Sequence, residues 1–209
     1  MLRILNQIMD NRDRIIEGAA ELFRTYGIKS VTMDSLATRL GMSKRTIYEV
    51  FSDKDELLIG VLKWMAVRQK ELVKKILDES ENTILAIFKL LEINRDHFQQ
   101  MSPAFQADMK RFHHEVLMKK ADKCNMPDYR INIEVIEHGI KEKLFRNDLN
   151  VDLVTRCIFS MVRSIMDNEL YPYELFPRHD VVRNVLINYL RGISTSEGVD
   201  LINKLESEF

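Results

Sequence analysis

Two short segments with helical periodicity lie on either side of a glycine-containing turn between residues 32 and 51. The first begins at Thr32, a favourable N-cap residue, and carries Asp34 in its first turn, where the helix dipole stabilises a carboxylate. Gly41 can adopt the left-handed backbone that ends such a helix. After this three-residue turn Ser43 can cap the second segment. Two capped short helices at this spacing predict a helix-turn-helix.

The second segment has one apolar side and one polar side. Ile47, Val50 and Phe51 share a face that we expect to hold the helix to a bundle. The residues left pointing outwards are Lys44, Arg45, Thr46, Tyr48 and Glu49. A short helix with basic, hydroxyl and aromatic groups on its free side suits the DNA major groove, which is about 12 Å wide. The alternative is an ordinary solvated helix face, but the two capped helices favour DNA.

The rest of the chain also has helical periodicity, and no stretch alternates apolar and polar residues as a strand does. We therefore predict an all-α protein with about nine helices. The expected helices fall near residues 15–26, 32–40, 43–51, 53–77, 102–126, 133–144, 150–170, 182–192 and 196–209, the last being weaker. Residues 1–56 would form a three-helix domain with the helix-turn-helix, and residues 57–209 a larger helical domain that binds a ligand and dimerises.

Composition describes an ordinary globular chain, with 45% hydrophobic and 30% charged residues. The net charge of −1 gives no strong signal for a polyanion, so DNA binding must be argued from local placement. No apolar run is long enough to span a membrane or to resemble a signal peptide, which predicts a cytoplasmic protein with no membrane partner. In that compartment Cys124 and Cys157 are expected to be reduced thiols.

From Ile15 to Leu58, about a fifth of the chain, the sequence resembles the DNA-binding domain of the tetracycline-repressor (TetR) family. The matching residues occur in one ordered run: Ala20, Leu22-Phe23, Gly27, Val31-Thr32, Ala37, Leu40-Gly41-Met42-Ser43, Thr46-Ile47-Tyr48, Phe51, Lys54 and Leu57-Leu58. The resemblance implies a ligand-responsive transcriptional regulator of double-stranded DNA, most simply a repressor that releases a palindromic operator when a small molecule binds.

The resemblance also assigns positions that contact DNA: Thr32, Ser43, Lys44, Arg45, Thr46, Tyr48 and Lys54. Tyr48 and Lys54 would bind phosphate, and residues 44–46 would lie nearest the bases. The chain departs from the common family pattern, which has glycine at position 45 and an aromatic residue or histidine at positions 49 and 50. Glu49 would lie near phosphates, which is unfavourable unless it pairs with Arg45 or accepts a hydrogen bond from a cytosine amine. The operator sequence therefore cannot be transferred from relatives.

The family's effector pocket lies among the middle helices, which makes a set of aromatic, methionine and polar residues candidates for contacting an unknown small-molecule effector. The candidates are Trp64, Met65, Arg68, Phe88, Phe98, Phe105, Met109, Phe112 and His113. Aromatic and methionine stripes at helical spacing more often belong to a plain core. Arg68 and His113 are of most interest, because a polar group in an apolar pocket usually orients the ligand.

A homodimer is implied by the family, whose last two long helices pair with those of a second subunit. Residues 150–170 fit this arrangement, because Leu153 and Cys157 lie on a different side from Val154, Ile158 and Ile165. The alternative is that one subunit covers both sides. Two-fold symmetry would also match a palindromic operator.

Enzymes and metalloproteins find little support in the sequence. No phosphate-binding glycine-rich loop, Gly-x-Ser-x-Gly or His-Glu-x-x-His motif is present, and no cofactor is predicted. The residues His97, His113, His114, His138 and Cys124 lack metal-ligand spacing, so no metal site is predicted. Two alternatives stay open: a helical adaptor or dimerisation protein that uses the N-terminal domain for protein contacts, and an unrecognised enzyme.

Overall fold

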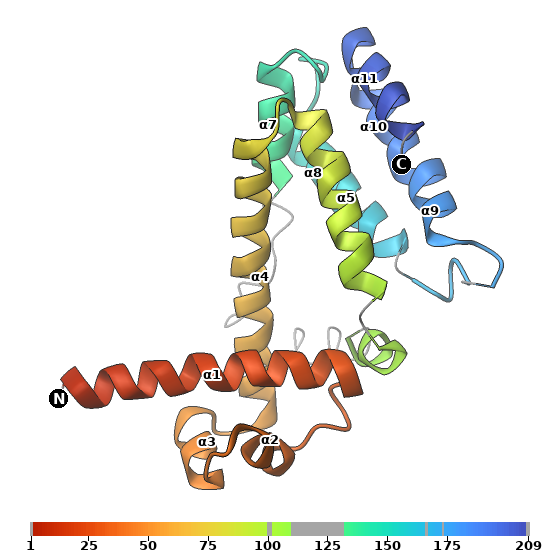
Figure 1. Cartoon of the computed structure of the whole chain (residues 1–209). Helices are drawn as coiled ribbons and strands as arrows, with labels where there is room; N and C mark the ends of the chain where they lie inside the picture. The colour runs from red at the N-terminus through yellow and green to blue at the C-terminus, as the bar shows by residue number, and fades with distance from the viewer. Residues whose placement is uncertain (1, 100–101, 110–131, 166, 173, 208–209) are drawn as a thin grey trace. The chain divides into compact units, whose positions relative to one another are not determined.

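The computed structural model describes residues 2–99, 102–109, 132–165, 167–172 and 174–207, with side chains described outside residues 2–10 and 96–99. The prediction of an all-α protein is confirmed: these residues form helices and turns, with one isolated bridge between Phe145 and Ser194 and no strand (Figure 1). The helices are α1 (Leu2–Tyr26), α2 (Met33–Leu40), α3 (Lys44–Val50), α4 (Lys54–Glu79), α5 (Thr83–Gln99), α7 (Ile133–Lys141), α8 (Val151–Ile165), α9 (Arg178–Val181), η3 (Val182–Ile187), α10 (Asn188–Ile193) and α11 (Ser196–Glu206). Residues 103–109 are also helical.

The chain divides into two compact units, each with its own hydrophobic core. The first comprises residues 1–69 and 93–127, and the second comprises residues 70–92 and 128–209. The helix α4 is continuous through the division, with residues 54–69 in the first unit and 70–79 in the second. At 26 residues it is about 39 Å long.

The core of the first unit is built from the apolar stripes of α1 to α4. Figure 1 shows α1 crossing the first half of α4, with α2 and α3 packed beside this crossing. Burial of apolar side chains on all four helices stabilises the arrangement. The fully buried members include Ile15, Phe23, Leu36, Ile47, Phe51, Leu57 and Leu58. Phe105, from the helix of residues 103–109, belongs to the same core and is 3% exposed.

Local capping interactions set the helix-turn-helix, as the sequence predicts. The Thr32 side chain accepts a hydrogen bond from the Ser35 backbone N–H at 3.0 Å, and the Ser35 hydroxyl accepts one from the Thr32 N–H at 2.9 Å. Gly41 ends α2 with a φ of 63°, in the left-handed region, and the Met42 N–H donates to the Ala37 carbonyl at 3.0 Å. Ser43 then caps α3 through the Thr46 N–H at 3.1 Å. These caps hold the two helices at a fixed angle and register.

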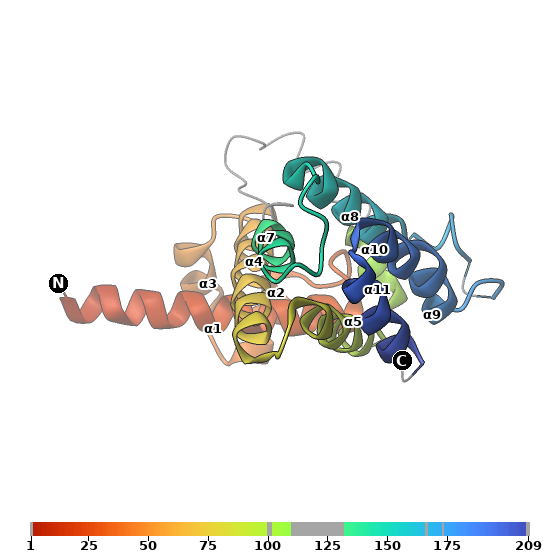
Figure 2. The same cartoon turned by 90° about the horizontal axis from the view of Figure 1, so that it is seen from above.

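The second unit has two connected groups of buried side chains. One group joins the end of α4 to α5 and α7 through Val73, Leu77, Ala86, Leu90 and Val135. The other joins α5, α7 and α8 to the run from α9 to α11. Its buried members include Phe88, Ile136, Phe145, Val154, Ile165, Ile187, Leu190 and Ile202. Figure 2, a view from above, shows the end of α4 beside α5 and α7, and α8 packs against α7 and η3.

The structure corrects three details of the helix prediction. The sequence interpretation included no helix between residues 77 and 102, where α5 lies. The helix expected near residues 182–192 begins earlier, because α9, η3 and α10 form one run from Arg178 that ends at Ile193, one residue after the expected end. The C-terminal segment, expected to be weaker, is a well-capped helix: the Thr195 hydroxyl accepts from the Gly198 N–H at 3.3 Å.

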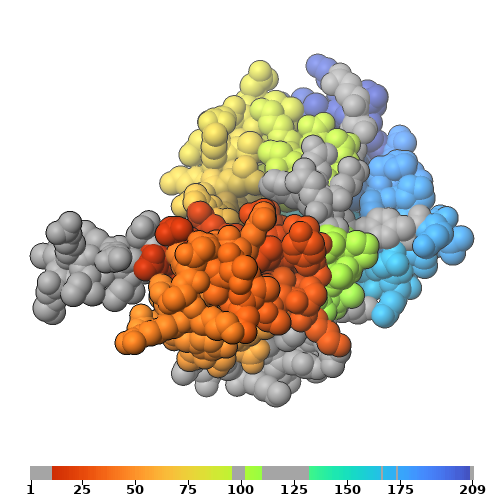
Figure 3. Space-filling model, turned by 60° about the horizontal axis from the view of Figure 1, so that its bottom comes forward, coloured from red at the N-terminus to blue at the C-terminus, as the bar shows by residue number. Residues whose placement is uncertain are grey.

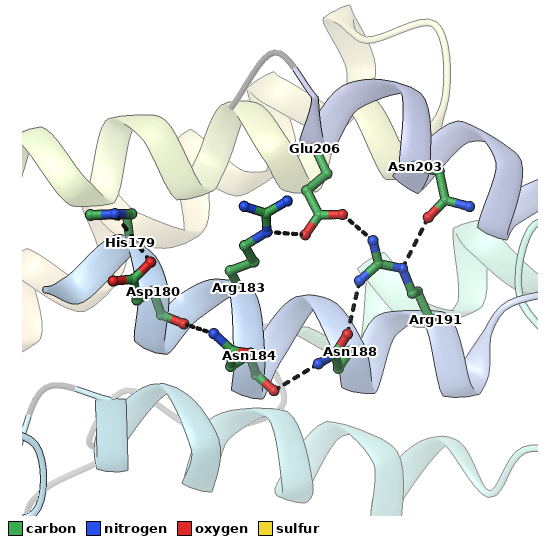
Figure 4. A network of polar contacts seen from close by, with 8 residues as sticks. All are labelled: His179, Asp180, Arg183, Asn184, Asn188, Arg191, Asn203 and Glu206. Atoms are coloured by element: carbon green, nitrogen blue, oxygen red, sulfur yellow. Dashed lines mark hydrogen bonds and ion pairs between the residues drawn. The ribbon is translucent and has the colours of Figure 1, made fainter. Parts of the chain in front are cut away.

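A polar network attaches α11 to the run of helices that precedes it (Figure 4). The Glu206 carboxylate accepts from the Nε of Arg183 at 2.8 Å and forms an ion pair with Arg191. Arg191 also donates to Asn203 at 3.0 Å and to Asn188 at 2.8 Å. One carboxylate thus interacts with two guanidinium groups. The Glu206 side chain is only 11% exposed, so this contact is largely shielded from water.

Candidate nucleic-acid interface

The surface of α2 and α3 carries most of the residues predicted to contact DNA. In Figure 3 atoms of this region (orange) form one continuous surface at the front, and no other segment is drawn over them. Lys44, Arg45, Thr46 and Tyr48 lie on α3, whose Ile47 is completely buried on the opposite side. Tyr48 is 50% exposed. The structure therefore brings these four residues together on one accessible face, as the sequence predicts.

The hydroxyl groups at this face already form hydrogen bonds within the protein. The Thr32 oxygen caps α2, and the Ser43 oxygen caps α3 while it shares a hydrogen bond with the Thr46 hydroxyl at 2.8 Å. All of these bonds are exposed to solvent. An exposed serine or threonine hydroxyl can still donate its proton to a phosphate oxygen while its lone pairs accept from a backbone N–H.

Each cation on the face of α2 and α3 lies beside a carboxylate. Arg39 faces Glu21 of α1 at 3.7 Å between Nη2 and Oε1, and Lys44 forms an ion pair with Asp34 of α2. The carboxylate Oε1 of Glu49 accepts from the Nε of Arg45 at 2.8 Å, and this hydrogen bond raises the pKa of the Arg45 guanidinium. The predicted pairing of Arg45 with Glu49 is present.

The Arg39 and Lys44 pairs could not be predicted from spacing along one helix. They join residues that lie on different helices, and only the packing of α1, α2 and α3 brings the charges together. Every side chain in these pairs is more than half exposed, so each pair contributes little to stability, at most about 1 kcal/mol. Phosphates can therefore displace the carboxylates at little cost.

Lys54 lies at the start of α4, where it contacts the turn between α1 and α2. Its Nζ donates to the Lys29 carbonyl at 3.2 Å. Burial lowers the pKa of Lys54, and the charges of Asp108 and Asp55 oppose that shift. Asp108, from the helix of residues 103–109, accepts from the Lys29 N–H at 2.7 Å. Lys54, which is predicted to bind a phosphate, is thus held against the turn that leads into the helix-turn-helix.

The same turn explains why residue 27, one of the residues that carry the family resemblance, is a glycine. Gly27 has a φ of 85°, and a Cβ added there would lie 2.9 Å from the Ala104 Cβ and 3.0 Å from the Asp108 carboxylate. The helix of residues 103–109 can therefore approach the end of α1 only because residue 27 has no side chain. Asp108 and Ala104 were not predicted to support the interface, because no local pattern connects them to residues so far away in sequence.

The residues predicted to contact a ligand are divided between core and surface. Met65 and Trp64 are partly buried against the core of the first unit. Arg68 lies over the Trp64 ring at 5.4 Å from its centroid and faces Glu17 at 3.8 Å, with a side chain that is 60% exposed. The structure thus gives Arg68 partners in α1 and α4, where the sequence interpretation expected a polar group inside an apolar pocket.

The remaining ligand candidates belong to two cores or lie outside the described parts. Phe105 is buried and Met109 partly buried in the first unit, whereas Phe88 is buried in the second. The side chain of Phe98, together with Phe112 and His113, lies outside the described residues.

Neither of two open clefts in the described structure is lined by a predicted ligand residue. One of about 400 Å³ lies in the first unit, lined by Arg12, Ser52, Asp53, Glu56, Ile59, Gly60 and Lys63. The other, of about 300 Å³, lies between α4 and α7 in the second unit, lined by Lys74, Leu77, Asp78, Glu134, Glu137 and His138. The lining of the second cleft is mostly charged, whereas pockets for drug-sized ligands are mostly apolar. The assignment of the ligand residues stays a prediction.

The side of α8 predicted to face a second subunit carries two exposed weakly polar or apolar side chains, Leu153 and Cys157. Val154 and Ile165 are buried, whereas Leu153, which is 59% exposed, and the exposed Cys157 lie on another side of the helix. The two sides of this helix therefore differ as the sequence predicts. Within the described ranges, no helix is both long and apolar enough to cross a membrane, and no three metal-binding side chains are grouped around a common point.

Comparisons with known proteins agree with this geometry. Residues 15–61 match the family described as bacterial regulatory proteins, tetR family. The chain is 28% identical over 165 residues to the HTH-type transcriptional repressor KstR2 of Mycobacterium tuberculosis, covering 76% of this chain and 80% of that protein.

Two solved structures have a similar fold. A TetR-family transcriptional regulator from Cytophaga hutchinsonii gives a TM-score of 0.69 at 18% identity, covering 91% of this chain and 98% of that one. A gamma-butyrolactone receptor (ArpA-like protein) gives a TM-score of 0.59 at 20% identity, covering 97% and 100%.

Proposed function

Because the chain belongs to the tetR family of bacterial regulatory proteins, we propose that it is a transcriptional repressor that binds double-stranded DNA through α3 and responds to a small molecule. The observation that carries the proposal is the exposed face of α3. Its back is fixed by Ile47, its N-terminus is capped by Ser43, and its front presents Lys44, Arg45 and Tyr48. This is the arrangement that places base-contacting side chains in a major groove.

We propose that the residues act in two classes. Lys44, Arg45 and Thr46 would lie nearest the bases, whereas Tyr48 and Lys54, with Thr32 and Ser43, would bind phosphates. Phosphate contacts fix the position of the protein on DNA, and base contacts select the sequence. The separate support for Lys54 is its contact with the Lys29 carbonyl, which holds the ammonium group at the edge of the face.

A titration against DNA at two salt concentrations tests the proposal. A protein that neutralises phosphates releases counterions, so its affinity falls steeply as salt rises. The two alternatives, a helical adaptor or dimerisation protein and an enzyme, predict no such dependence. We propose a regulator without catalytic activity, because its relatives are named as transcriptional regulators and repressors.

Replacing Lys54 by alanine should weaken binding to operator and random DNA by the same factor. The salt dependence of the affinity should become shallower by about one charge, because one phosphate contact is lost. The measurement is fluorescence anisotropy over a series of salt concentrations. Lys204→Ala, an exposed lysine on α11, removes the same charge elsewhere and should leave the slope unchanged. A loss confined to one operator sequence would contradict the phosphate role.

Homodimerisation is part of the proposal. The exposed side chains of Leu153 and Cys157 on α8 support a contact with a second copy, and two-fold symmetry fits an operator with two half-sites. We further propose that residues 1–56 act as the DNA-binding domain and residues 57–209 as the effector-binding and dimerisation domain. A cytoplasmic location follows from the proposed action on DNA.

Ligand response is proposed to pass through α4, which begins beside α3 and continues into the second unit. A ligand that contacts Trp64, Met65 or Arg68 would tilt this helix and change the distance between the two copies of α3 in a dimer. A ligand can shift the equilibrium only by its difference in affinity for the two spacings.

We expect a coupling of about 1–3 kcal/mol, a change of roughly 5- to 150-fold in operator affinity. Thermal-shift screening would find a ligand, and operator affinity would be measured with and without it. A compound that binds beside Trp64 and leaves operator affinity unchanged would contradict this route.

A further inference from the structure

The ion pair between Arg45 and Glu49 has a geometry that bears on which DNA sequence the protein selects. Both residues lie on the exposed side of α3, one turn apart, with side chains 88% and 60% exposed. The carboxylate accepts only from the Nε of Arg45, at 2.8 Å. The contact lies on the same face as Lys44 and Tyr48, where DNA would bind.

The position of this hydrogen bond leaves the end of the guanidinium available. An arginine has five N–H donors in a rigid plane, and the bond to Glu49 uses the one on Nε. The two terminal nitrogens keep their outward N–H groups, which match the O6 and N7 acceptors at the major-groove edge of guanine. A bond at Nε also limits rotation of the long side chain, so less conformational entropy remains to be lost on binding.

We propose that Glu49 is a positioning and specificity-determining residue, which aims the terminal N–H groups of Arg45 at a guanine and weakens binding to DNA that lacks this base. The inference rests on the proposed function, because it requires α3 to lie in the major groove. Glu49 acts through Arg45 and makes no base contact of its own.

The negative charge of Glu49 weakens binding to DNA that lacks the guanine. In the major groove a carboxylate lies between two rows of phosphates, which repel it. Arg45 lies beside Glu49 on any DNA, so the remaining repulsion acts on every sequence, and the contact of Arg45 with guanine compensates for it only where that base is present. The other cations of the face give little surplus charge, because Arg39 and Lys44 are paired with Glu21 and Asp34. DNA without the correct base is therefore bound weakly, which raises the ratio of specific to non-specific affinity.

Selection from a DNA library with randomised positions tests this proposal, with affinities measured afterwards on the selected and on random sequences. The proteins are the wild type, Arg45→Ala, Glu49→Ala, Glu49→Gln and a control, Glu137→Gln, which removes an exposed carboxylate from α7. Wild type should prefer guanine at one position of each half-site by roughly 5- to 150-fold, the discrimination expected of one bidentate contact. Arg45→Ala should abolish that preference.

Glu49→Ala should reduce the same guanine preference although Arg45 is still present, and should raise the affinity for random DNA by about threefold, as expected from removing one nearby like charge. Glu49→Gln keeps an oxygen that can accept from Nε. It should therefore retain more of the preference while it raises affinity for random DNA equally. Glu137→Gln should change neither quantity.

An unchanged guanine preference in Glu49→Ala would overturn the positioning role. Loss of a cytosine preference in Glu49→Ala, with the guanine preference intact, would overturn it in favour of a direct contact between Glu49 and cytosine. Sequence-selective, salt-dependent binding by wild type in which Arg45→Ala alters no base preference would overturn this inference and leave the proposed function standing. A wild-type protein that selects no sequence at any salt concentration would overturn both.

Discussion

Replacing Phe105 by alanine is expected to destabilise the first unit by about 3–5 kcal/mol, the usual cost of removing a buried aromatic ring. Phe105 is 3% exposed and lies in the same core as the helix-turn-helix residues Leu36 and Ile47. It comes from a segment more than fifty residues beyond α3. The loss should therefore weaken DNA binding, although Phe105 lies in the core and cannot contact DNA.

Two polar contacts join the segment around Phe105 to α1 and the turn that follows it, and a third caps the segment's own helix. The Ser102 N–H donates to the Arg24 carbonyl at 2.9 Å, the Ser102 hydroxyl accepts from the Phe105 N–H at 3.1 Å, and Asp108 accepts from the Lys29 N–H. Chemical denaturation of the full chain, followed by tryptophan fluorescence from Trp64, measures the change in unfolding free energy.

Phe105→Leu keeps most of the apolar volume and should cost less than about 1.5 kcal/mol. Phe176→Ala, at a residue that is 45% exposed, serves as the control and should cost little. Equal stabilities for Phe105→Ala and Phe176→Ala would show that the segment around residue 105 does not support the DNA-binding helices.

Replacing Glu206 by alanine is expected to destabilise the second unit by about 2–3 kcal/mol. Breaking a buried ion pair costs about 3–5 kcal/mol, and the value is lower here because Arg183 is 60% exposed and keeps access to water. Arg191, which is 26% exposed, loses its charged partner. Since the network in Figure 4 joins α11 to α10, α11 should detach first.

The stabilisation that the Glu206 carboxylate provides should depend on pH in a defined direction. Burial alone would raise the pKa of Glu206, but hydrogen bonds and charge from Arg191 and Arg183 lower it overall from its ordinary value. A carboxylate with a lowered pKa in the folded state stabilises the protein above its unfolded pKa, and the benefit is lost as pH falls through the folded value. The stability difference between wild type and Glu206→Gln should therefore be constant near neutral pH and shrink below about pH 4.

Hydrogen exchange of α11 and thermal denaturation across pH measure these effects. Asp200→Asn, at an exposed position of the same helix, should change stability by less than about 0.5 kcal/mol. A stability difference between wild type and Glu206→Gln that grows as the pH falls would contradict the role of the ionised carboxylate.

The features that could be predicted from the sequence are those fixed by near neighbours in the chain. Thr32, Gly41 and Ser43 set the ends of α2 and α3 through bonds that span only a few residues, so their pattern is visible in the sequence. The pairing of Arg45 with Glu49 follows from one turn of helix. These local rules place the helix-turn-helix and its exposed face correctly.

The features that could not be predicted depend on packing between distant segments. The contacts of Asp34 with Lys44, and of Asp108 with the turn after α1, arise only when separate helices meet. α5 is an exception: its signals are local but the prediction misses them, because Asn82, a favourable N-cap residue whose side chain accepts from the Leu85 N–H at 2.9 Å, precedes a continuous helical sequence. The sequence pattern cannot identify the ligand-binding residues, because buried aromatic residues have the same helical spacing in a core as in a ligand pocket.

The most direct test of the central claim is to recover the DNA that the purified protein retains from fragmented genomic DNA at moderate salt and to sequence it. Binding through two copies of α3 predicts one enriched motif with two-fold symmetry, with half-sites spaced by one helical turn, about 34–36 Å, or a multiple of it. Retention should fall steeply as salt rises. Fragments with no common motif, retained equally at low and high salt, would contradict the assignment of α3 as a DNA-reading helix.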